Sequence, residues 1–469
     1  MREKSTKFYV GAGVLLALGA VFYIWYCQYT MTELPHLTWF DQFPIVKDYF
    51  SDNLSWSTFC NRYGEHGMLG YNFLFLFNVA FLHMTTSFDV ILNDINVIIC
   101  GVLLLYAFFK TMQKRQHSLI VSLCGAGSIV LFNFGCMQGS SGAMETQVRL
   151  GILFFIIAAI LIDYLLQSGT SSRIWLAVTI AVIFISLNLF GTLYSFAAAP
   201  LIFIVCFVLA LRSKDQRIRV NAIGVNLAYV LGTVLYIFEY NLLASSSFQD
   251  LDNGGILSTV WTILTHPFET LLSVFSYAAS SVLGYGSWTE HKISDSAYLA
   301  IGLMITLCAL YAVWRFFQAK LYKYTWMPLF LMGYAIMVFV LTLIGRYNSW
   351  QWFINEWYQV HAKLLPISIV WILCLDVVKG KYFLRGVQVI ACSALVVFTI
   401  FGNAAQLERA PWIKLYYEEK QPYLFVEDAK DMPVDENGLT PLIMPLDITM
   451  DCINTMREYK LSVYWYGVK

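Results

Sequence analysis

The chain has 469 residues, of which 58% are hydrophobic and 13% charged, with a mean hydropathy of +0.62 and a formal net charge of zero. Soluble domains carry roughly a quarter charged residues, so this composition excludes an ordinary soluble protein. The neutral balance gives no indication of nucleic-acid binding. Apolar runs of about 17–20 residues recur, long enough to cross a hydrocarbon core of about 30 Å. The composition therefore predicts an all-α polytopic membrane protein.

The N-terminus has the charge order of a signal sequence, MREKSTK followed by a long apolar run. The run is too long for a typical signal peptide and no small-x-small cleavage site follows, so we interpret it as a retained signal anchor. Hydropathy predicts about eleven spans, at residues 8–28, 94–110, 118–135, 149–167, 174–191, 195–211, 221–239, 297–315, 325–343, 364–379 and 386–403.

Basic residues gather at alternate ends of these spans, and the positive-inside rule assigns those ends to the cytoplasm. The clusters are Arg2, Lys4 and Lys7; Lys110, Lys114 and Arg115; Arg173; Arg212, Lys214, Arg217 and Arg219; Arg315, Lys320 and Lys323; and Lys379, Lys381 and Arg385. The cytoplasmic connections are too short for a nucleotide-binding domain. We therefore expect a protein of the bacterial cytoplasmic membrane with a cytoplasmic N-terminus, and with its C-terminus and active site extracytoplasmic.

Two further apolar segments, 68–84 and 256–285, would put a basic cluster on the wrong side if either alone crossed the membrane. We expect both to be juxtamembrane or re-entrant helices on the outer face. The alternative is a thirteen-helix protein in which both segments span the membrane.

The sequence divides into a transmembrane domain, 1–403, and a small extracytoplasmic C-terminal segment, 404–469. The segment is polar, acidic and rich in proline, and it could form a mixed α/β fold. At this size it is marginally stable alone, so we expect it to pack on the outer loops. Four cysteines at or beyond the outer surface could form disulfides, although the sequence assigns no partners: Cys27, Cys60, Cys136 and Cys452.

The first outer loop, residues 29–93, holds most of the candidate chemistry. Asp41 follows Trp39 and Phe40, which would seat it at headgroup depth, where a partly desolvated carboxylate could act as a general base. The alternative is a solvated acid on an amphipathic helix. Asp48 and the RYGEHG stretch add candidates for substrate binding: Arg62, Glu65 and His66 could hold a polar substrate or pair with one another to cap the helix that follows.

A second cluster lies between the ninth and tenth spans, in GRYNSWQWFINEWYQVHAK. Arg346 is placed to bind a lipid phosphate through its guanidinium, and His361 and Lys363 would add positive charge from the same side. The aromatic residues between them are either an interfacial belt or a platform for sugar and polyprenyl groups. The sequence has no CxxC, HExxH, P-loop or GxSxG motif, which disfavours ATP-driven transport, zinc hydrolysis and serine-hydrolase chemistry.

This layout resembles the GT-C superfamily of integral-membrane glycosyltransferases, which use polyprenyl-phosphate-linked sugars as donors. Three features carry the resemblance: the first outer loop with Asp41 in WFDQF, the YGEHGMLGYNFLF stretch, and Gly345, Arg346 and Tyr347 with a basic residue before the tenth span. It implies an inverting transfer with Asp41 as base and with Arg346, Tyr347, His361 and Lys363 near the lipid phosphate. It also implies membrane-lipid partners and, for a monophosphate donor, no metal cofactor.

The chain departs from this pattern in lacking a tandem acidic pair after Asp41 and a sequon-binding motif. A glycan or lipid acceptor is therefore expected, rather than protein. Pyrophosphate donors often use a divalent metal, so metal dependence stays open. Two alternative functions also stay open: a lipid-linked-sugar flippase or transporter, and a surface-polysaccharide polymerase or ligase.

Overall fold

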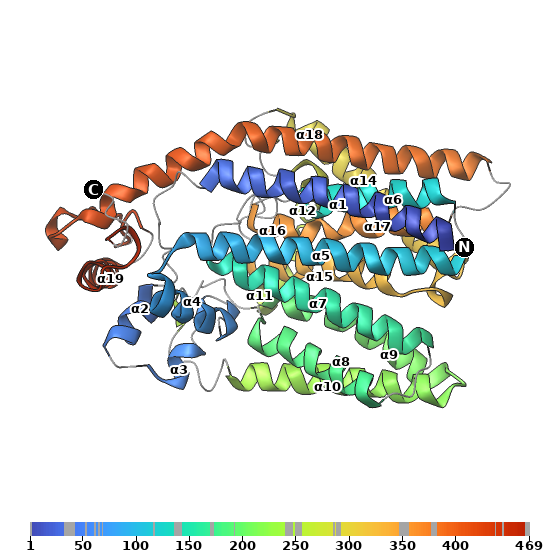
Figure 1. Cartoon of the computed structure of the whole chain (residues 1–469), viewed down its shortest axis with the longest axis horizontal. Helices are drawn as coiled ribbons and strands as arrows, with labels where there is room; N and C mark the ends of the chain where they lie inside the picture. Colours follow the sequence, from blue (N-terminus) through green and yellow to red (C-terminus); the bar gives the residue numbers. More distant parts are fainter. Residues whose placement is uncertain are drawn as a thin grey trace.

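A computed structural model of the chain describes residues 2–31, 43–51, 54–60, 62–63, 66–67, 69–115, 118–135, 143–168, 173–191, 193–239, 247–248, 256–284, 287, 292–346, 356–376, 382–436, 438–442 and 445–464. Most of these residues lie in helices, and the long helices form a bundle (Figure 1).

Eight helices of the described residues are long and apolar enough to cross a membrane. They are α1 (Arg2–Met31), α5 (Thr86–Arg115), α7 (Ala143–Ser168), α9 (Ala199–Arg212) with the 3-10 helix η3 (Leu193–Ala198) before it, α10 (Gln216–Phe238), α14 (Asp295–Gln318), α15 (Met327–Arg346) and α18 (Tyr382–Lys420). All eight coincide with predicted spans, and the described residues confirm an all-α protein of membrane-embedded character.

The other three predicted spans fall on shorter apolar helices. They are α6 (Leu119–Asn133), α8 (Arg173–Phe184) with the π-helix η2 (Ile185–Leu189), and α17 (Leu364–Leu375), which follows α16 (Glu356–Ala362). An α-helix rises 1.5 Å per residue, so each of these is shorter than a hydrocarbon core of about 30 Å. The count of eleven crossings thus remains a prediction.

One end of the bundle carries the small elements of the first loop, and we call it the loop end (Figure 1). Here lie α2 (Phe43–Phe50), α3 (Trp56–Phe59) and α4 (Leu69–Leu82), together with three two-residue strands. Strand β1 (Arg62–Tyr63) pairs antiparallel with β2 (His66–Gly67) and parallel with β3 (Ser247–Phe248). The strands thus connect the RYGEHG stretch to the chain beyond α10.

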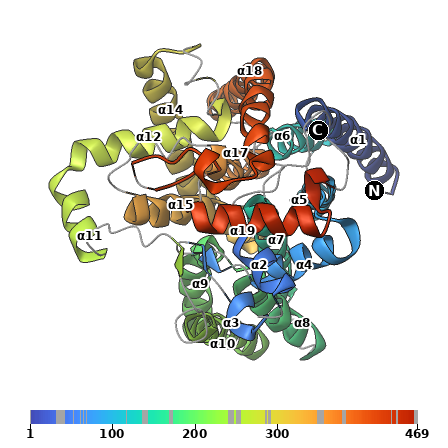
Figure 2. The same ribbon diagram turned by 90° about the vertical axis from the view of Figure 1, so that its left-hand side faces the viewer.

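The segment 256–285 forms two helices, α11 (Ile256–Thr265) and α12 (Pro267–Leu283), which are broken at His266. Pro267 starts α12, where its missing N–H is no loss. Figure 2 shows α11 and α12 running across the view while α10 is seen nearly end-on. A Cβ at Gly302 would lie 1.9 Å from the Phe275 carbonyl oxygen, so this glycine lets α12 and α14 cross closely.

The C-terminal segment continues from α18, a single helix that passes through residues 403 and 404 and ends at Lys420. Beyond it lie η7 (Gln421–Phe425), η8 (Ala429–Asp431), α19 (Leu446–Glu458) and η9 (Ser462–Tyr464). The one β-bridge in this described part joins Leu439 and Pro445. The segment shares an apolar cluster with α2 and α4, which confirms the prediction that it packs on the first loop.

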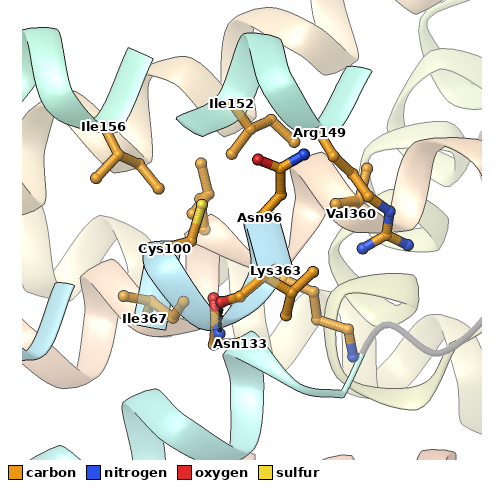
Figure 3. Close-up of a pocket in the computed structure, with 11 residues that line it drawn as sticks. Asn96, Cys100, Asn133, Arg149, Ile152, Ile156, Val360, Lys363 and Ile367 are labelled. Atoms are coloured by element: carbon orange, nitrogen blue, oxygen red, sulfur yellow. Dashed lines mark hydrogen bonds between the residues drawn. The ribbon is translucent and has the colours of Figure 1, made fainter. Parts of the chain in front are cut away.

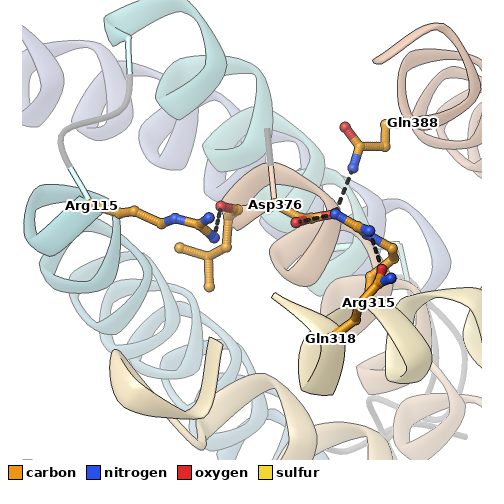
Figure 4. Close-up of polar contacts among 6 residues, drawn as sticks. Arg115, Arg315, Gln318, Asp376 and Gln388 are labelled. Atoms are coloured by element: carbon orange, nitrogen blue, oxygen red, sulfur yellow. Dashed lines mark hydrogen bonds and ion pairs between the residues drawn. The ribbon is translucent and has the colours of Figure 1, made fainter. Parts of the chain in front are cut away.

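The opposite end, which we call the N-terminal end, is held by buried polar contacts (Figure 4). Arg315 of α14 pairs with Asp376 after α17, with Nη2 and Oδ1 2.9 Å apart, and the Gln388 amide of α18 donates to the same carboxylate at 3.1 Å. Arg115 of α5 donates to the Leu375 carbonyl. These contacts connect four helices away from the loop end.

Between the two ends the described interior is apolar. Helix α17 is buried along its whole length, and its Trp371 ring packs edge-on against Phe108 of α5. Cys27, Cys60 and Cys452 are buried, whereas Cys136 lies outside the described residues. Among the three that are described, no disulfide forms.

Candidate functional site

A small, partly open cavity of about 30 Å³ lies among α5, α6, α7, α16 and α17. By volume it has room for roughly two water molecules. We call it the chamber, and its lining residues are Asn96, Val97, Cys100, Asn133, Arg149, Ile152, Ile156, Val360, Lys363, Leu364 and Ile367.

Helical periodicity brings these side chains to one place. On α7, Arg149, Ile152 and Ile156 are three and four residues apart, and Val360, Lys363, Leu364 and Ile367 repeat that spacing across α16 and α17. Residues at such spacings share one helix face. Helix α7 and the α16–α17 segment therefore each present an apolar stripe with one cation to the chamber.

Both charged residues of the lining are cations, and both are deeply buried. Arg149, Lys363 and Asn96 are each 3% exposed. Figure 3 shows the guanidinium and the ammonium group reaching toward the same side of the chamber, away from Ile156, Cys100 and Ile367. Burying a cation is costly unless a counter-charge meets it. The chamber is thus suited to an anionic group.

Neutral amide donors supplement the cations. Asn133 of α6 donates to the Val97 carbonyl at 2.9 Å, which fixes its orientation. The Asn96 amide nitrogen has no hydrogen-bond partner among the described residues, although it is buried against the chamber. A buried donor without a partner is rare and points to an unseen acceptor, either water or ligand.

One carboxylate, that of Asp94, lies close to Arg149. Asp94 of α5 is 8% exposed, feels the charge of Arg149 and accepts a hydrogen bond from the Cys27 thiol of α1. A carboxylate in this place can orient the guanidinium and offset part of its charge. Asp94 thus connects α1 to the chamber through Arg149.

His361 lies near the chamber and is not one of its lining residues. Its Nδ1 and the Tyr334 hydroxyl are 2.9 Å apart, and the Tyr194 ring lies 4.7 Å from its ring, centroid to centroid. Next to it, the Gln406 amide of α18 donates to Gln359 at 3.0 Å. These contacts give His361 a packing role that orients the turn before Lys363.

The predicted site residues divide into three groups. Asp41, Glu65 and Tyr347 lie outside the described residues. The backbones of Arg62, His66 and Arg346 are placed in β1, in β2 and at the last residue of α15, while their side chains are not described. Of the predicted residues whose side chains are described, Lys363 lines the chamber, whereas His361 and Asp48 do not.

Asp48 lies on α2 at the loop end. Partial burial raises the pKa of its carboxyl above the ordinary value of 3.8, while a hydrogen bond with Thr58 and the charge of Lys47 lower it. A carboxyl held this way is placed to support the contact between α2 and α3.

Sequence reasoning missed Arg149, Asn96 and Asp94. A signal was present, because Arg149 is the only cation within the span at 149–167, and Asp94 and Asn96 interrupt the start of the span at 94–110. An ionisable residue inside a span is by default a candidate for function. What the sequence could not show is that these positions face one another.

A second polar site lies at the end of α10. Burial raises the pKa of Glu239 from its ordinary value of 4.5 to about 7. Burial, with a smaller effect of the Glu239 charge, raises the pKa of the Cys60 thiol to about 11. Cys60 belongs to a small apolar cluster with Leu69 and Tyr236, so this site joins the first loop to α10.

In the described part of the chain, no group of three or more His, Cys, Asp or Glu side chains is arranged to hold a metal ion. A scan of known protein families finds no model that matches this chain, and a search of characterised proteins finds no significant match.

Proposed function

We propose that the protein is a GT-C-type membrane glycosyltransferase that moves a monosaccharide from a polyprenyl-phosphate donor to a glycan or lipid acceptor. The loop end would face outward from a bacterial cytoplasmic membrane. The observation that supports this most is the pair of buried cations, Arg149 and Lys363, on one cavity at the end of the bundle near the first loop. A lipid-borne phosphate is an anion that can accept charge-assisted hydrogen bonds from both side chains.

The chamber limits which part of the donor enters it. With room for roughly two water molecules, the chamber suits phosphate oxygens better than a sugar ring. The donor phosphate would therefore meet Arg149, Lys363 and Asn96 at the mouth of the chamber, with the sugar on the first-loop side. Arg346 and Tyr347 would contact the same phosphate from the end of α15.

The reaction would be an inverting displacement at the sugar C1. The acceptor oxygen forms its bond to C1 as the bond from C1 to the phosphate oxygen breaks, and polyprenyl phosphate leaves with that electron pair. Asp41 takes the proton of the acceptor hydroxyl. Arg149 and Lys363 stabilise the charge that develops on the leaving phosphate. Arg62, Glu65 and His66 would position the sugar or the acceptor.

The described interior favours an enzyme over a transporter. A transporter path needs polar or ionisable groups near the membrane midplane. Between Lys363 and Asp376, α17 carries no charged residue and is buried throughout. The buried charged side chains of the described residues include Arg149 and Lys363 in the chamber, Asp89 and Asp94 near the start of α5, and the Arg315–Asp376 contact at the N-terminal end. A flippase remains the second candidate, because a lipid phosphate would bind the chamber in either case.

Lipid mass spectrometry tests the proposal in cells. We would compare wild type, a deletion strain, Asp41→Asn and Arg149→Gln, with Arg217→Gln, an exposed cation at the start of α10, as the matched control. We expect the deletion and both site variants to accumulate one polyprenyl-phosphate monosaccharide whose sugar disappears from a surface glycan. If no lipid-linked sugar changes even in the deletion strain, the donor assignment is wrong.

A further inference from the structure

The C-terminal segment 421–464 and the first loop share one apolar core, which we call the docking cluster. Its members are Ile45, Val46, Tyr71, Phe75, Leu76, Val79 and Met84 from the first loop and Leu424, Met432, Leu442, Met450, Cys452, Ile453, Met456 and Leu461 from the segment. Burying apolar side chains from both parts in one core stabilises their packing against each other. The segment is therefore an integral part of the loop end.

Specific contacts at the edge of this cluster join α19 to α2. Lys47 of α2 forms an ion pair with Asp451 of α19, and both side chains are about half exposed. The Phe50 and Tyr459 rings stack with their centroids 4.0 Å apart. The Ser462 amide donates to the His83 carbonyl at 2.8 Å, which secures the far end of α4.

Helix α2 depends on these contacts for its own order. It has only eight residues, and isolated helices shorter than about 12–15 residues are marginal in water. Its main packing partners are α19, α4 and α3. Of these, α3 is a single turn of four residues, so α4 and α19 provide the stable surfaces.

The order of α2 bears directly on Asp41. Asp41 precedes the first residue of α2, Phe43, by two positions. A chain of two residues spans at most about 7 Å, so the sequence ties Asp41 closely to the start of α2. Whatever holds α2 in place therefore restricts where Asp41 can be.

We infer that the C-terminal segment positions the first outer loop for the reaction, with Asp451 and Tyr459 as positioning residues that hold α2 through Lys47 and Phe50. The effect on the reaction rests on the proposed function, whereas the ordering of α2 does not.

Hydrogen exchange of residues 43–51, measured by mass spectrometry on the full chain in nanodiscs, tests the ordering. The weakened variant combines Asp451→Lys with Tyr459→Ala, two changes at the solvent-exposed edge of α19 that leave the docking cluster intact. We expect about tenfold faster exchange in α2, because an ion pair and a ring stack are lost. Glu458→Lys makes the same charge change at an exposed position of α19 and should leave the exchange unchanged.

A charge swap tells whether faster exchange comes from loss of the Lys47–Asp451 ion pair or from a general disturbance of α19 by the substitution. Lys47→Glu added to Asp451→Lys should restore slow exchange, whereas Asp451→Lys alone should not. Consumption of the lipid-linked donor is then measured on the same proteins, and the weakened variant should lose activity in parallel. Unchanged exchange in the weakened variant would overturn the inference, and so would fast exchange in α2 with full donor consumption.

The two proposals fail in different ways. If wild type consumes no lipid-linked sugar, the proposed function is wrong, and the exchange data still decide whether α19 orders α2. If Arg149→Gln abolishes consumption while the weakened variant does not, the function stands and the positioning role is wrong.

Discussion

Arg149 and Lys363 come from helices that are more than 200 positions apart in the sequence, and their charged groups reach the same side of one cavity (Figure 3). Neither cation is solvated in the ordinary way, since each is nearly fully buried. Asp94 offsets part of the charge near Arg149, and Asn96 adds a donor with no hydrogen-bond partner among the described residues. At the scale of single residues, the site is an arrangement of donors for an oxyanion.

Glu239 provides a pH test at the same scale. Its folded pKa of about 7 lies above the ordinary 4.5, so the fold favours the protonated form. That contribution is fully present below pH 4.5 and is lost as the pH rises through 7. We expect Glu239→Gln to match wild type at pH 5 and to be more stable by about 1 kcal/mol at pH 8, a figure reduced for its half-exposed side chain.

Thermal unfolding in detergent at both pH values measures this difference, which should appear as a rise in Tm of the variant over wild type at pH 8 alone. An equal shift at both pH values would show that the effect is not a titration of Glu239.

At the scale of elements, the helices are held together by a few close contacts. Arg315 and Asp376 join α14 to the end of α17, and Gln388 adds α18 (Figure 4). At the crossing of α12 and α14, Gly302 leaves no room for a side chain. These two features hold α14 at both of its ends, and each predicts a specific loss of stability.

Removing one partner of the buried ion pair should lower the stability of the protein far more than replacing both partners with apolar residues. We expect Asp376→Ala to destabilise the protein by about 3–5 kcal/mol, because it leaves the Arg315 guanidinium buried without its counter-charge. The double variant Arg315→Met with Asp376→Leu should recover most of that loss. The folded yield and the Tm in detergent measure the stability of the single and the double variant. A double variant as unstable as the single one would contradict the pairing of Arg315 with Asp376.

Gly302→Ala should separate α12 from α14, because the new Cβ would lie 1.9 Å from the Phe275 backbone carbonyl oxygen. We expect a loss of about 1–3 kcal/mol, as for other overpacked sites. Gly386→Ala in α18 is the matched control, since nothing lies within 4 Å of its added Cβ, and it should be neutral or slightly stabilising. Equal Tm values for the two variants would contradict the close crossing of α12 and α14 at Gly302.

At the scale of the whole molecule, polar groups gather at the two ends and leave an apolar interior between them. The loop end combines the chamber, the first loop and the C-terminal segment, whereas the N-terminal end holds α14, α17, α18 and α5 together (Figures 1 and 4). This asymmetry fits the proposed function, in which the reaction takes place at the loop end.

Much of this organisation could be predicted from apolar run length alone. The span predicted at 94–110, which lies within α5, and the other long helices could be predicted because about 20 apolar residues have few alternatives to a span. The break at His266 and the continuation of α18 past residue 403 were not found, because Pro267 and the polar residues after 403 are ambiguous in sequence. Those boundaries depend on packing with α14 and α12.

The candidate site was predicted less completely. Lys363 was identified from its place before a span, and it lines the chamber. Arg149 and Asn96 were missed because each lies near the polar first turns of a long helix, and only the packing of α5 against α7 makes them neighbours. Sequence periodicity gives the face of one helix and does not say which helix that face meets.

The most direct test of the central claim is donor turnover by purified protein. Protein is added to membranes from a strain that lacks the gene, which hold both donor and acceptor, and lipids are followed by mass spectrometry. We predict that wild type and Arg217→Gln consume one polyprenyl-phosphate monosaccharide and release polyprenyl phosphate, while Arg149→Gln is slower by about 100-fold. If wild type consumes no lipid-linked sugar, or if Arg149→Gln works as fast as wild type, the chamber is not a donor-phosphate site.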